Sequence, residues 1–240
     1  MQDTLLIREV RMDWDRIAQD SYLRRIPALC GRSTLAFHKA VTFFAGENGS
    51  GKSTLLEAIA VAAGFNPEGG TRNYHFSTYD SHSALWNAVR LVRGVRPLQW
   101  GYFLRAESFY NVATQEEAYS REQGGRPQHF HKRSHGESFL ALMQDTFRGE
   151  GLYILDEPEA ALSPQRQLTL LMEMDRCRRA GAQFLIATHS PVLLGLPDAE
   201  ILSFDQGSIQ PIAYEETESY RVTSMFIAHR EQLLRQILDA

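Results

Sequence analysis

Short runs of apolar residues alternate along the chain with segments whose apolar positions have helical spacing. The apolar run 41–45 is followed by a helical pattern over 54–62. The runs 152–155 and 184–188 are continuously apolar, which is typical of strands buried in the middle of a parallel sheet. Residues 168–179 between them have helical spacing, so the pattern predicts a β-α-β unit.

Weaker patterns extend this prediction towards both ends of the chain. Gly207 lies between two short apolar runs, which predicts a hairpin. We expect further strands over 5–10, 35–40 and 100–106, hairpin strands over 201–204 and 209–214, and helices from about 138 and over 221–238.

The length of the chain limits the number of domains. Its 240 residues can bury one sizeable core, and no long Pro, Gly or Ser linker divides them. We therefore expect a single domain over 1–240. The chain has no apolar run of about 18 residues, and its first residues lack the basic start and apolar segment of a signal peptide. These features predict a cytoplasmic protein with no membrane partner.

Cysteine content and charge exclude some classes of site. Cys30 and Cys177 are far apart and outside any C-x-x-C spacing, so neither a disulfide framework nor a zinc site is predicted. The net charge of −4 gives no overall signature of nucleic-acid binding. Arginines outnumber acids over 90–133, which leaves open a local basic surface or arginines on solvated faces and in internal pairs.

The segment after the apolar run 41–45 carries the most specific pattern in the chain. It fits G-x-x-x-x-G-K-[ST], a phosphate-binding loop, between a predicted strand and a predicted helix. Such a loop turns its N–H groups towards an anion, and the helix start adds partial positive charge. Lys52 is expected to reach the β- and γ-phosphates of ATP, and Ser53 to bind Mg²⁺. The expected ATP-binding residues here are Gly46, Glu47, Asn48, Gly49, Ser50, Gly51, Lys52, Ser53 and Thr54.

Two carboxylates end the buried strand predicted over 152–155. Asp156 and Glu157 suit a metal ligand with a base beside it at the carboxyl end of a strand. Asp156 is expected to hold Mg²⁺ through its water shell, and Glu157 to polarise the attacking water. The alternative is a charged turn that caps the next helix.

His189 follows the other buried strand, over 184–188. Because the carboxyl ends of parallel strands meet at one edge of a sheet, we expect His189 beside the two earlier motifs. A lone histidine at such a position is usually structural, but the neighbouring motifs favour a role in catalysis. The predicted catalytic residues are therefore Lys52, Glu157 and His189.

The order of these motifs resembles that of the ABC-type ATPases. In that family a signature motif, Leu-Ser-Gly-Gly-Gln, lies shortly before the acidic strand. The matching stretch keeps Ser134 and Gly136 but has His135 in place of Gly and Glu137 in place of Gln. The resemblance implies that Ser134 and Gly136 contact ATP bound to the opposite subunit. Taken alone, the stretch fits a helix cap equally well.

Two further positions take their expected roles from the same resemblance. Ser163 stands where the family usually has the Asp of its D-loop, and is expected to contact ATP. Glu107 stands where the family has a metal-sensing Gln. A carboxylate can also ligate Mg²⁺, although its charge would alter the sensing chemistry. Pairing of Glu107 with a nearby arginine is the alternative.

The finer details look most similar to the soluble RecF/SMC/OLD-like branch, and in particular to compact bacterial AAA-family ATPases. The resemblance implies an α/β P-loop NTPase fold, an ABC-ATPase-like head with a mainly parallel core sheet and an antiparallel β portion. It also implies a small helical signature lobe at about 108–148.

The same resemblance implies Mg²⁺-dependent ATP hydrolysis that drives dimerisation of two copies around ATP. The expected setting is a soluble switch in DNA maintenance or anti-phage defence, with an effector protein as a partner and DNA left open as another. One alternative is the nucleotide-binding subunit of a membrane transporter, against which the altered signature and Glu107 count. Another is a slow ATP-dependent scaffold for a toxin or effector.

Overall fold

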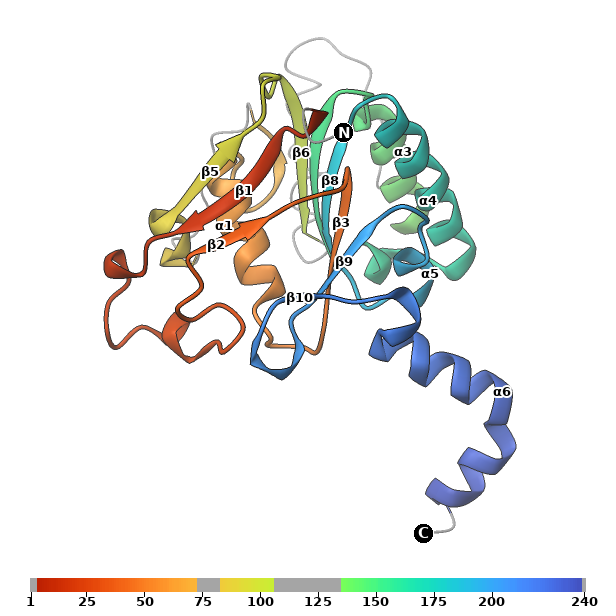
Figure 1. Ribbon diagram of the computed structural model, residues 1–240. Coiled ribbons are helices and arrows are strands. Elements are labelled where there is room, and N and C mark those ends of the chain that lie inside the picture. The colour runs from red at the N-terminus through yellow and green to blue at the C-terminus, as the bar shows by residue number, and fades with distance from the viewer. Residues whose placement is uncertain (1–3, 73–82, 106–134, 239–240) are drawn as a thin grey trace.

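The computed structural model describes residues 4–72, 83–105 and 135–238, with only the backbone path given for 135–139. The strands of the main sheet are β3 (Val41–Ala45), β4 (Gly70–Thr71), β6 (Trp100–Arg105), β7 (Gly151–Asp156), β8 (Gln183–Ala187), β9 (Glu200–Ser203) and β10 (Gln210–Pro211). Within the described residues their order is β10-β9-β3-β8-β7-β6-β4 (Figure 1). The strands from β9 to β6 are mutually parallel, and β10 and β4 pair antiparallel at the two edges. The expected mainly parallel α/β core is confirmed.

A smaller antiparallel sheet supplies the expected antiparallel portion. It consists of β1 (Ile7–Met12), β2 (Thr34–Ala36) and β5 (Val89–Arg93), in the order β2-β1-β5. Gln183, at the start of β8, connects the two sheets. Its Oε1 accepts hydrogen bonds from the N–H groups of Leu6 (2.9 Å) and Ile7 (2.8 Å), and its Nε2 donates to the Ile7 carbonyl (2.8 Å).

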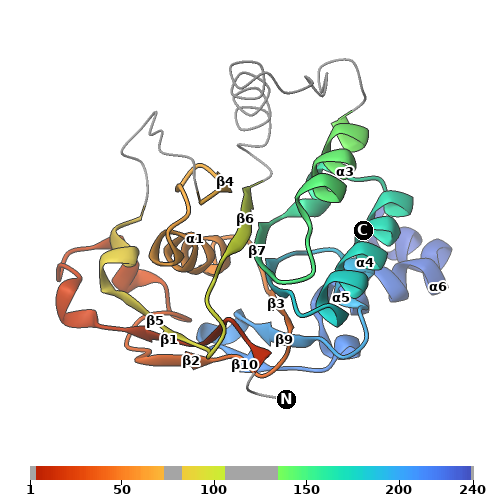
Figure 2. The ribbon, with the colours of Figure 1, turned by 90° about the horizontal axis from the view of Figure 1, so that it is seen from above.

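Helices cover both faces of the main sheet. They are α1 (Lys52–Ala63), α3 (His135–Thr146), α4 (Pro164–Arg179) and α5 (Pro191–Leu194), and the helix α6 (Glu218–Leu238) follows them in the chain. Figure 2 shows α1 and the antiparallel sheet on one side of the main sheet, and α3, α4 and α5 on the other. Short 3₁₀ segments lie at Trp14–Arg16, Tyr22–Arg25, Ala84–Ala88, Pro158–Ala161, Asp205–Gly207 and Tyr214–Glu216.

Each central strand contributes to two separate cores. Successive side chains of a strand point to opposite faces, so Leu152 and Ile154 of β7 join the core around α1. Tyr153 joins the core around α3, α4 and α5. Its ring lies 4.5 Å from that of Phe147 and 4.9 Å from that of Phe184, measured between centroids. This packing on both faces explains the continuous apolar runs of these strands.

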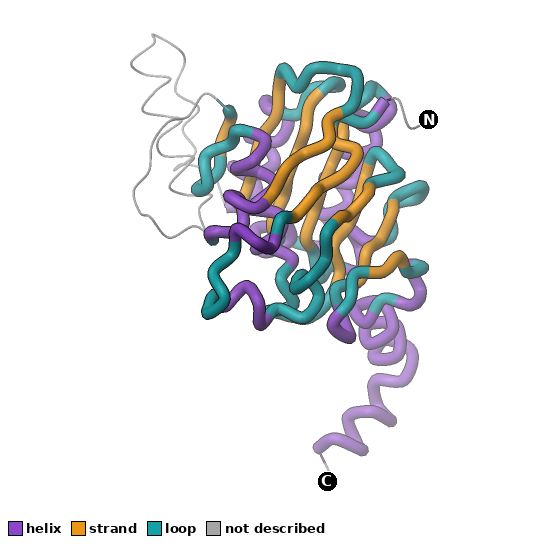
Figure 3. Tube along the Cα trace, turned by 60° about the vertical axis from the view of Figure 1, so that its left-hand side comes forward, coloured by secondary structure: helices purple, strands orange, loops and turns teal. Residues whose placement is uncertain are grey.

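The helix α6 differs from the others because it leaves the body of the protein, as Figure 3 also shows. None of its residues is buried. Within the described ranges, no helix is long and apolar enough to span a membrane.

The strands β2 and β5 differ from the prediction. The pattern did not predict β5, because a half-exposed antiparallel strand keeps few residues on its core side, and Arg90 and Arg93 interrupt the run. The strand expected over 35–40 is β2, which ends at Ala36. Among the residues that the structure describes, β2 pairs only with β1, along Glu9 to Arg11.

Candidate nucleotide-binding site

Residues 46–51 form a loop that joins β3 to α1 at the carboxyl end of the parallel strands; we call it the phosphate loop. β3 is buried at every position, and α1 begins at Lys52. Gly51 has a φ of 101°, and a Cβ atom there would lie 2.6 Å from Ile26 Cγ2. Any larger residue would therefore be strained and would collide with this neighbour. The strand-loop-helix arrangement of a phosphate-binding loop is present.

The side chain of Lys52 turns back over the phosphate loop. Its Nζ donates hydrogen bonds to the carbonyl oxygens of Gly46 (2.6 Å) and Glu47 (2.8 Å), and the residue is 4% exposed. Burial lowers the pKa of Lys52 from its usual value, while the nearby carboxylates, first among them Glu157 and Asp205, raise it. An ammonium group in this position can contact an anion held by the loop.

Ser53 and Asp156 meet below the phosphate loop. Ser53 lies in the first turn of α1, and Asp156 ends β7. The Ser53 hydroxyl donates a hydrogen bond of 2.8 Å to Asp156 Oδ1. Hydroxyl and carboxylate oxygens are ligands that Mg²⁺ takes together with water and substrate phosphates. The pair fits such an ion, while the described residues contain no group of three or more His, Cys, Asp or Glu that could hold a metal alone.

An arginine that the sequence did not single out lies between two carboxylates at this site. Arg105, at the end of β6, is the register partner of Asp156. Its Nη1 lies 2.8 Å from Glu57 Oε2 and its Nε 3.9 Å from Asp156 Oδ2. Glu57 is buried in α1, so the guanidinium offsets part of the cost of burying both acids. The only feature of the sequence that hinted at this pair was Glu57, a glutamate within the apolar pattern of a helix.

Glu157 has a backbone conformation that is rare for a residue with a side chain. Its φ and ψ are both 51°, in the left-handed region. Its N–H donates to the Ala187 carbonyl at 3.0 Å, which joins the ends of β7 and β8. Backbone strain of this kind costs about 1–3 kcal/mol, and it clusters at functional sites.

His189, just beyond β8, lies next to the end of the acidic strand. Its Nε2 is 3.8 Å from Glu157 Oε1, and its backbone N–H donates to Glu159 Oε1 at 2.6 Å. The structure therefore brings the three motifs to one edge of the sheet, as their order predicted. Glu159 was not predicted as a site residue, although a second acid after Asp156-Glu157-Pro158 could have drawn attention to it.

Asp205 is a further residue that sequence reasoning missed. Its Oδ1 accepts a hydrogen bond from the Glu47 N–H (3.0 Å), and its Oδ2 accepts one from the Ser203 hydroxyl (3.0 Å). A Cβ atom on Gly46 would lie 2.8 Å from Asp205 Oδ1, so glycine permits this close approach. Asp205 thus fixes the start of the phosphate loop from the side of β9. The sequence could have indicated Asp205 in the same way as Asp156, because Asp205 is also an acid that follows a buried strand.

The structure describes two of the remaining predicted site residues, Ser163 and Gly136. Ser163 is exposed at the start of α4, where its side chain makes no capping hydrogen bond. Gly136 lies in the first turn of α3. Glu107, Ser134 and most of the expected lobe at 108–148 lie outside the described residues. The roles assigned to these four residues stay predictions.

Two family models match the sequence of the chain. One, described as an AAA domain, matches residues 24–126. The other, described as an AAA domain, putative AbiEii toxin, Type IV TA system, matches residues 124–195. No curated protein matches the chain.

Solved structures with a similar fold come from SMC and ABC proteins. The SMC head domain from Thermotoga maritima is 16% identical, with a TM-score of 0.48, and the match covers 87% of this chain and 100% of that one. The protein cbiO1 from Clostridium perfringens, part of the ABC transporter complex cbiONQ, is 13% identical, with a TM-score of 0.48 and coverage of 97% and 98%. An ATP-binding cassette of an ABC transporter is 18% identical, with a TM-score of 0.45 and coverage of 93% and 97%.

The two family matches meet within residues 124–126. The first contains the phosphate loop, and the second contains Asp156, Glu157 and His189. These are the segments that the fold brings to one edge of the main sheet. The chain is therefore similar to AAA domains in the two segments that carry the predicted site.

Proposed function

We propose that this chain is a Mg²⁺-dependent ATPase. The observation that carries the proposal is the hydrogen bond between Ser53 and Asp156, formed directly beneath a phosphate loop that holds Lys52. In the proposed site Lys52 contacts the β- and γ-phosphates, and the phosphate loop binds them through its N–H groups. Ser53 and Asp156 hold Mg²⁺, which, when bound, neutralises charge on the phosphates.

The proposed hydrolytic groups are Glu157 and His189. Glu157 accepts a proton from the attacking water, and His189 stabilises charge on the γ-phosphate. Their side chains are 43% and 38% exposed, so a single chain covers this part of its site only in part, although His189 Nε2 itself is enclosed.

A partly open site supports the proposal that two copies of the chain enclose ATP between them. By the resemblance to ABC-type ATPases, Ser134 and Gly136 of one copy complete the site of the other, with Ser163 nearby and Glu107 as a further Mg²⁺ ligand. A closed arrangement of this type has two-fold symmetry and contains two ATP molecules. ATP then drives association, and hydrolysis permits separation.

The biological setting in this proposal is a soluble switch in DNA maintenance or anti-phage defence, with an effector protein as partner. A second candidate is an ATP-dependent scaffold for a toxin, which the words "putative AbiEii toxin, Type IV TA system" in the matched family description favour. Mass spectrometry of the proteins that copurify with Glu157→Gln in ATP distinguishes the two, because it identifies a toxin or another effector.

The ATPase itself is tested by calorimetry and sedimentation. Lys52→Ala should abolish ATP binding, whereas Lys39→Ala, at an exposed position outside the site, should not. Glu157→Gln should bind ATP, lose turnover, and increase in mass from one oligomeric state to a larger or tighter one when ATP and Mg²⁺ are added. Ser134→Arg should prevent that increase and retain ATP binding. Unchanged ATP affinity in Lys52→Ala would overturn the site. An unchanged mass with ATP, together with normal turnover in Ser134→Arg, would overturn the dimer.

A further inference from the structure

Arg105, at the end of β6, contacts two carboxylates that belong to different elements. Its Nη1 lies 2.8 Å from Oε2 of Glu57 in α1, and its Nε lies 3.9 Å from Oδ2 of Asp156 in β7. The side chain of Arg105 is 26% exposed, whereas those of both acids are only 10% exposed. The positive charge of Arg105 is therefore held between two nearly buried negative charges.

Glu57 is also fixed from its other side. Its second oxygen, Oε1, accepts a hydrogen bond of 2.8 Å from the N–H of Ser83. Glu57 lies four positions after Ser53 in α1, so both residues project from the same face of that helix. Arg105 and Asp156 are register partners in the parallel pair of β6 and β7. One face of α1 therefore contacts both strands, through one hydrogen bond and one ion pair.

The two oxygens of Asp156 have different neighbours as a result. Oδ1 accepts the hydrogen bond of the Ser53 hydroxyl, and Oδ2 faces Arg105. The Ser53 hydroxyl and Asp156 are the groups to which Mg²⁺ is assigned above. Turning the carboxylate would move negative charge away from Arg105, so the guanidinium favours the orientation in which Oδ1 lies beside Ser53. Groups that contact a metal ligand from behind commonly orient it in this way.

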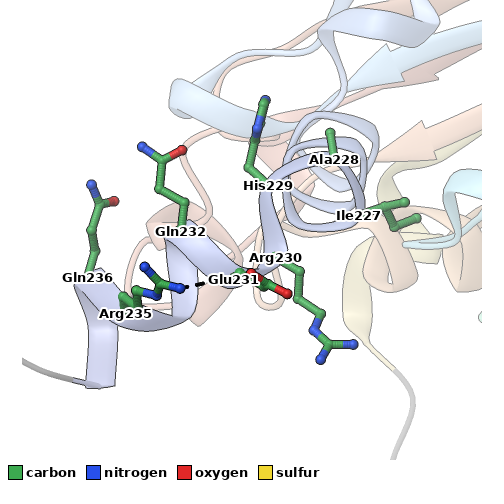
Figure 4. A pocket seen from close by; sticks show the side chains of 8 residues that line it. All are labelled: Ile227, Ala228, His229, Arg230, Glu231, Gln232, Arg235 and Gln236. Carbon is green, nitrogen blue, oxygen red and sulfur yellow. Dashed lines mark ion pairs between the residues drawn. The ribbon is translucent and has the colours of Figure 1, made fainter.

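An exposed ion pair on α6 shows the contrast. Arg235 and Glu231 lie 4.0 Å apart, with side chains 78% and 84% exposed (Figure 4). Water screens such a pair, so it contributes little to stability. The contacts of Arg105 are largely withdrawn from water, but burial of charge also costs free energy, and a buried pair is weak evidence of added stability. The effect that we attribute to Arg105 is therefore the orientation of Asp156.

We propose that Arg105 is a positioning residue of the nucleotide site, which orients Asp156 for Mg²⁺ while Glu57 holds Arg105 in place. The inference rests on the function proposed above, and it gives a role to two residues to which that function assigns none. Arg105 and Glu57 act on the ion only through Asp156.

The charge and the orienting contact of Arg105 affect Mg²⁺ in opposite directions. A positive charge repels the ion, so removal of the charge alone would strengthen Mg²⁺ binding. Loss of orientation weakens it. The Glu57 carboxylate lies 2.8 Å from Arg105 and offsets most of this repulsion, so the charge effect is small. Loss of a group that orients a metal ligand typically lowers metal affinity by about 10- to 100-fold, and orientation should therefore prevail.

Calorimetry of ATP binding to the full chain tests the sign. We call the ratio of ATP affinities with and without Mg²⁺ the Mg²⁺ effect. Arg105→Met keeps an unbranched side chain without charge or donors, and should reduce the Mg²⁺ effect by about tenfold or more. ATP affinity without Mg²⁺ should change by less than about threefold, because Lys52 and the phosphate loop are retained. Arg235→Met, in the exposed pair of α6, is the matched control and should behave as wild type.

A double variant separates positioning from a loss of folding. Arg105→Met leaves the nearly buried Glu57 carboxylate without this ion pair, which should lower thermal stability. Arg105→Met with Glu57→Gln removes both charges and keeps an oxygen acceptor for the Ser83 N–H. The double variant should regain stability, while its Mg²⁺ effect stays about tenfold or more below that of wild type. Arg235→Met with Glu231→Gln is the matched double control.

The possible results distinguish the role of Arg105 from the proposed function. An Mg²⁺ effect equal to or larger than that of wild type, in either folded Arg105 variant, would overturn the positioning role and leave the Mg²⁺ site intact. Equal losses of ATP affinity with and without Mg²⁺ would also overturn it, because Arg105 would then act on the nucleotide directly. If wild type itself shows no Mg²⁺ effect, the proposed Mg²⁺ site is wrong, and the role of Arg105 is overturned with it.

Discussion

The Ser53 hydroxyl donates a hydrogen bond of 2.8 Å to Asp156 Oδ1, across 103 positions of sequence. This contact joins the first turn of α1 to the end of β7, so the phosphate loop and the acidic strand are held together by their own side chains. Two oxygen atoms of the kind that bind Mg²⁺ are thereby brought to one place without help from a ligand. Preorganisation of this type reduces the cost of assembling the site when nucleotide binds.

Ser53→Ala tests the Mg²⁺ ligand directly. The change removes one oxygen ligand and leaves Lys52 and the loop backbone in place, so ATP should still bind without Mg²⁺. We expect the increase in ATP affinity that Mg²⁺ gives to fall by about tenfold or more. Calorimetry with and without Mg²⁺ measures this increase, and Ser53→Thr, which keeps a hydroxyl, is the control. If Mg²⁺ has equal effects on wild type and Ser53→Ala, Ser53 is not a ligand.

The part of the site that could be predicted from sequence consists of groups in recognisable patterns. The phosphate loop has a fixed spacing of Gly, Lys and Ser, and Asp156 and His189 follow strands that are buried on both faces. Buried parallel strands leave long apolar runs, so their carboxyl ends can be located from the sequence alone. The positions of these residues along the chain were therefore sufficient to predict that they lie close together.

The contacts of the missed residues leave no such pattern, although Asp205 itself follows a buried strand. Asp205 accepts from the Glu47 N–H, and Glu159 accepts from the His189 N–H. Every residue except proline has a backbone N–H, so the partner's identity carries no signal. The pair of Arg105 and Glu57 joins two elements whose distance apart is set by tertiary packing, which the sequence does not reveal.

The buried phenol of Tyr153 should make the folded protein less stable at high pH. Burial raises the pKa of its phenol from 10.0 to about 12. The folded state thus favours the neutral form, so the stability that Tyr153 contributes is complete below pH 10 and is lost as the pH rises towards 12. Over this interval we expect a loss of up to about 3 kcal/mol in the free energy of unfolding.

Urea unfolding of wild type and Tyr153→Phe across this interval measures that loss. Wild type should lose its advantage over Tyr153→Phe as the pH rises, because phenylalanine has no proton to release. Tyr22→Phe, at an exposed position, serves as the matched control and should follow wild type. A constant difference between wild type and Tyr153→Phe would contradict the prediction.

Gln183→Leu should destabilise the fold by separating the two sheets at their join. Gln183 is 1% exposed and makes three hydrogen bonds to the backbone of Leu6 and Ile7. Leucine has a similar volume but leaves these groups without their partner, which should cost about 2–5 kcal/mol of unfolding free energy. Gln232→Leu, on the exposed surface of α6, should change it by less than about 0.5 kcal/mol. Chemical denaturation monitored by tryptophan fluorescence compares the variants, and equal midpoints would refute the bridging role.

Glu159 is predicted to position His189. Its Oε1 accepts the His189 N–H at 2.6 Å, while His189 Nε2 lies 3.8 Å from Glu157 Oε1. Glu159→Ala removes the acceptor that fixes the backbone of His189, so the imidazole should lose its alignment with Glu157. We expect kcat to fall by roughly tenfold to a hundredfold, because a small displacement of a catalytic group is costly.

The split between kcat and ATP affinity separates positioning from a general loss of structure. In the part of the chain that the structure describes, Glu159 forms no hydrogen bond with the phosphate loop and acts on Lys52 only through its charge, so we expect ATP affinity to change by less than about threefold. Glu159→Gln keeps an oxygen acceptor at the same place and should recover most of the wild-type kcat. Steady-state kinetics and calorimetry, with thermal unfolding as a check on folding, measure these quantities. If Glu159→Gln is as slow as Glu159→Ala, the negative charge rather than the hydrogen bond is required. If both variants hydrolyse ATP at the wild-type rate, the contact between Glu159 and His189 does not serve catalysis.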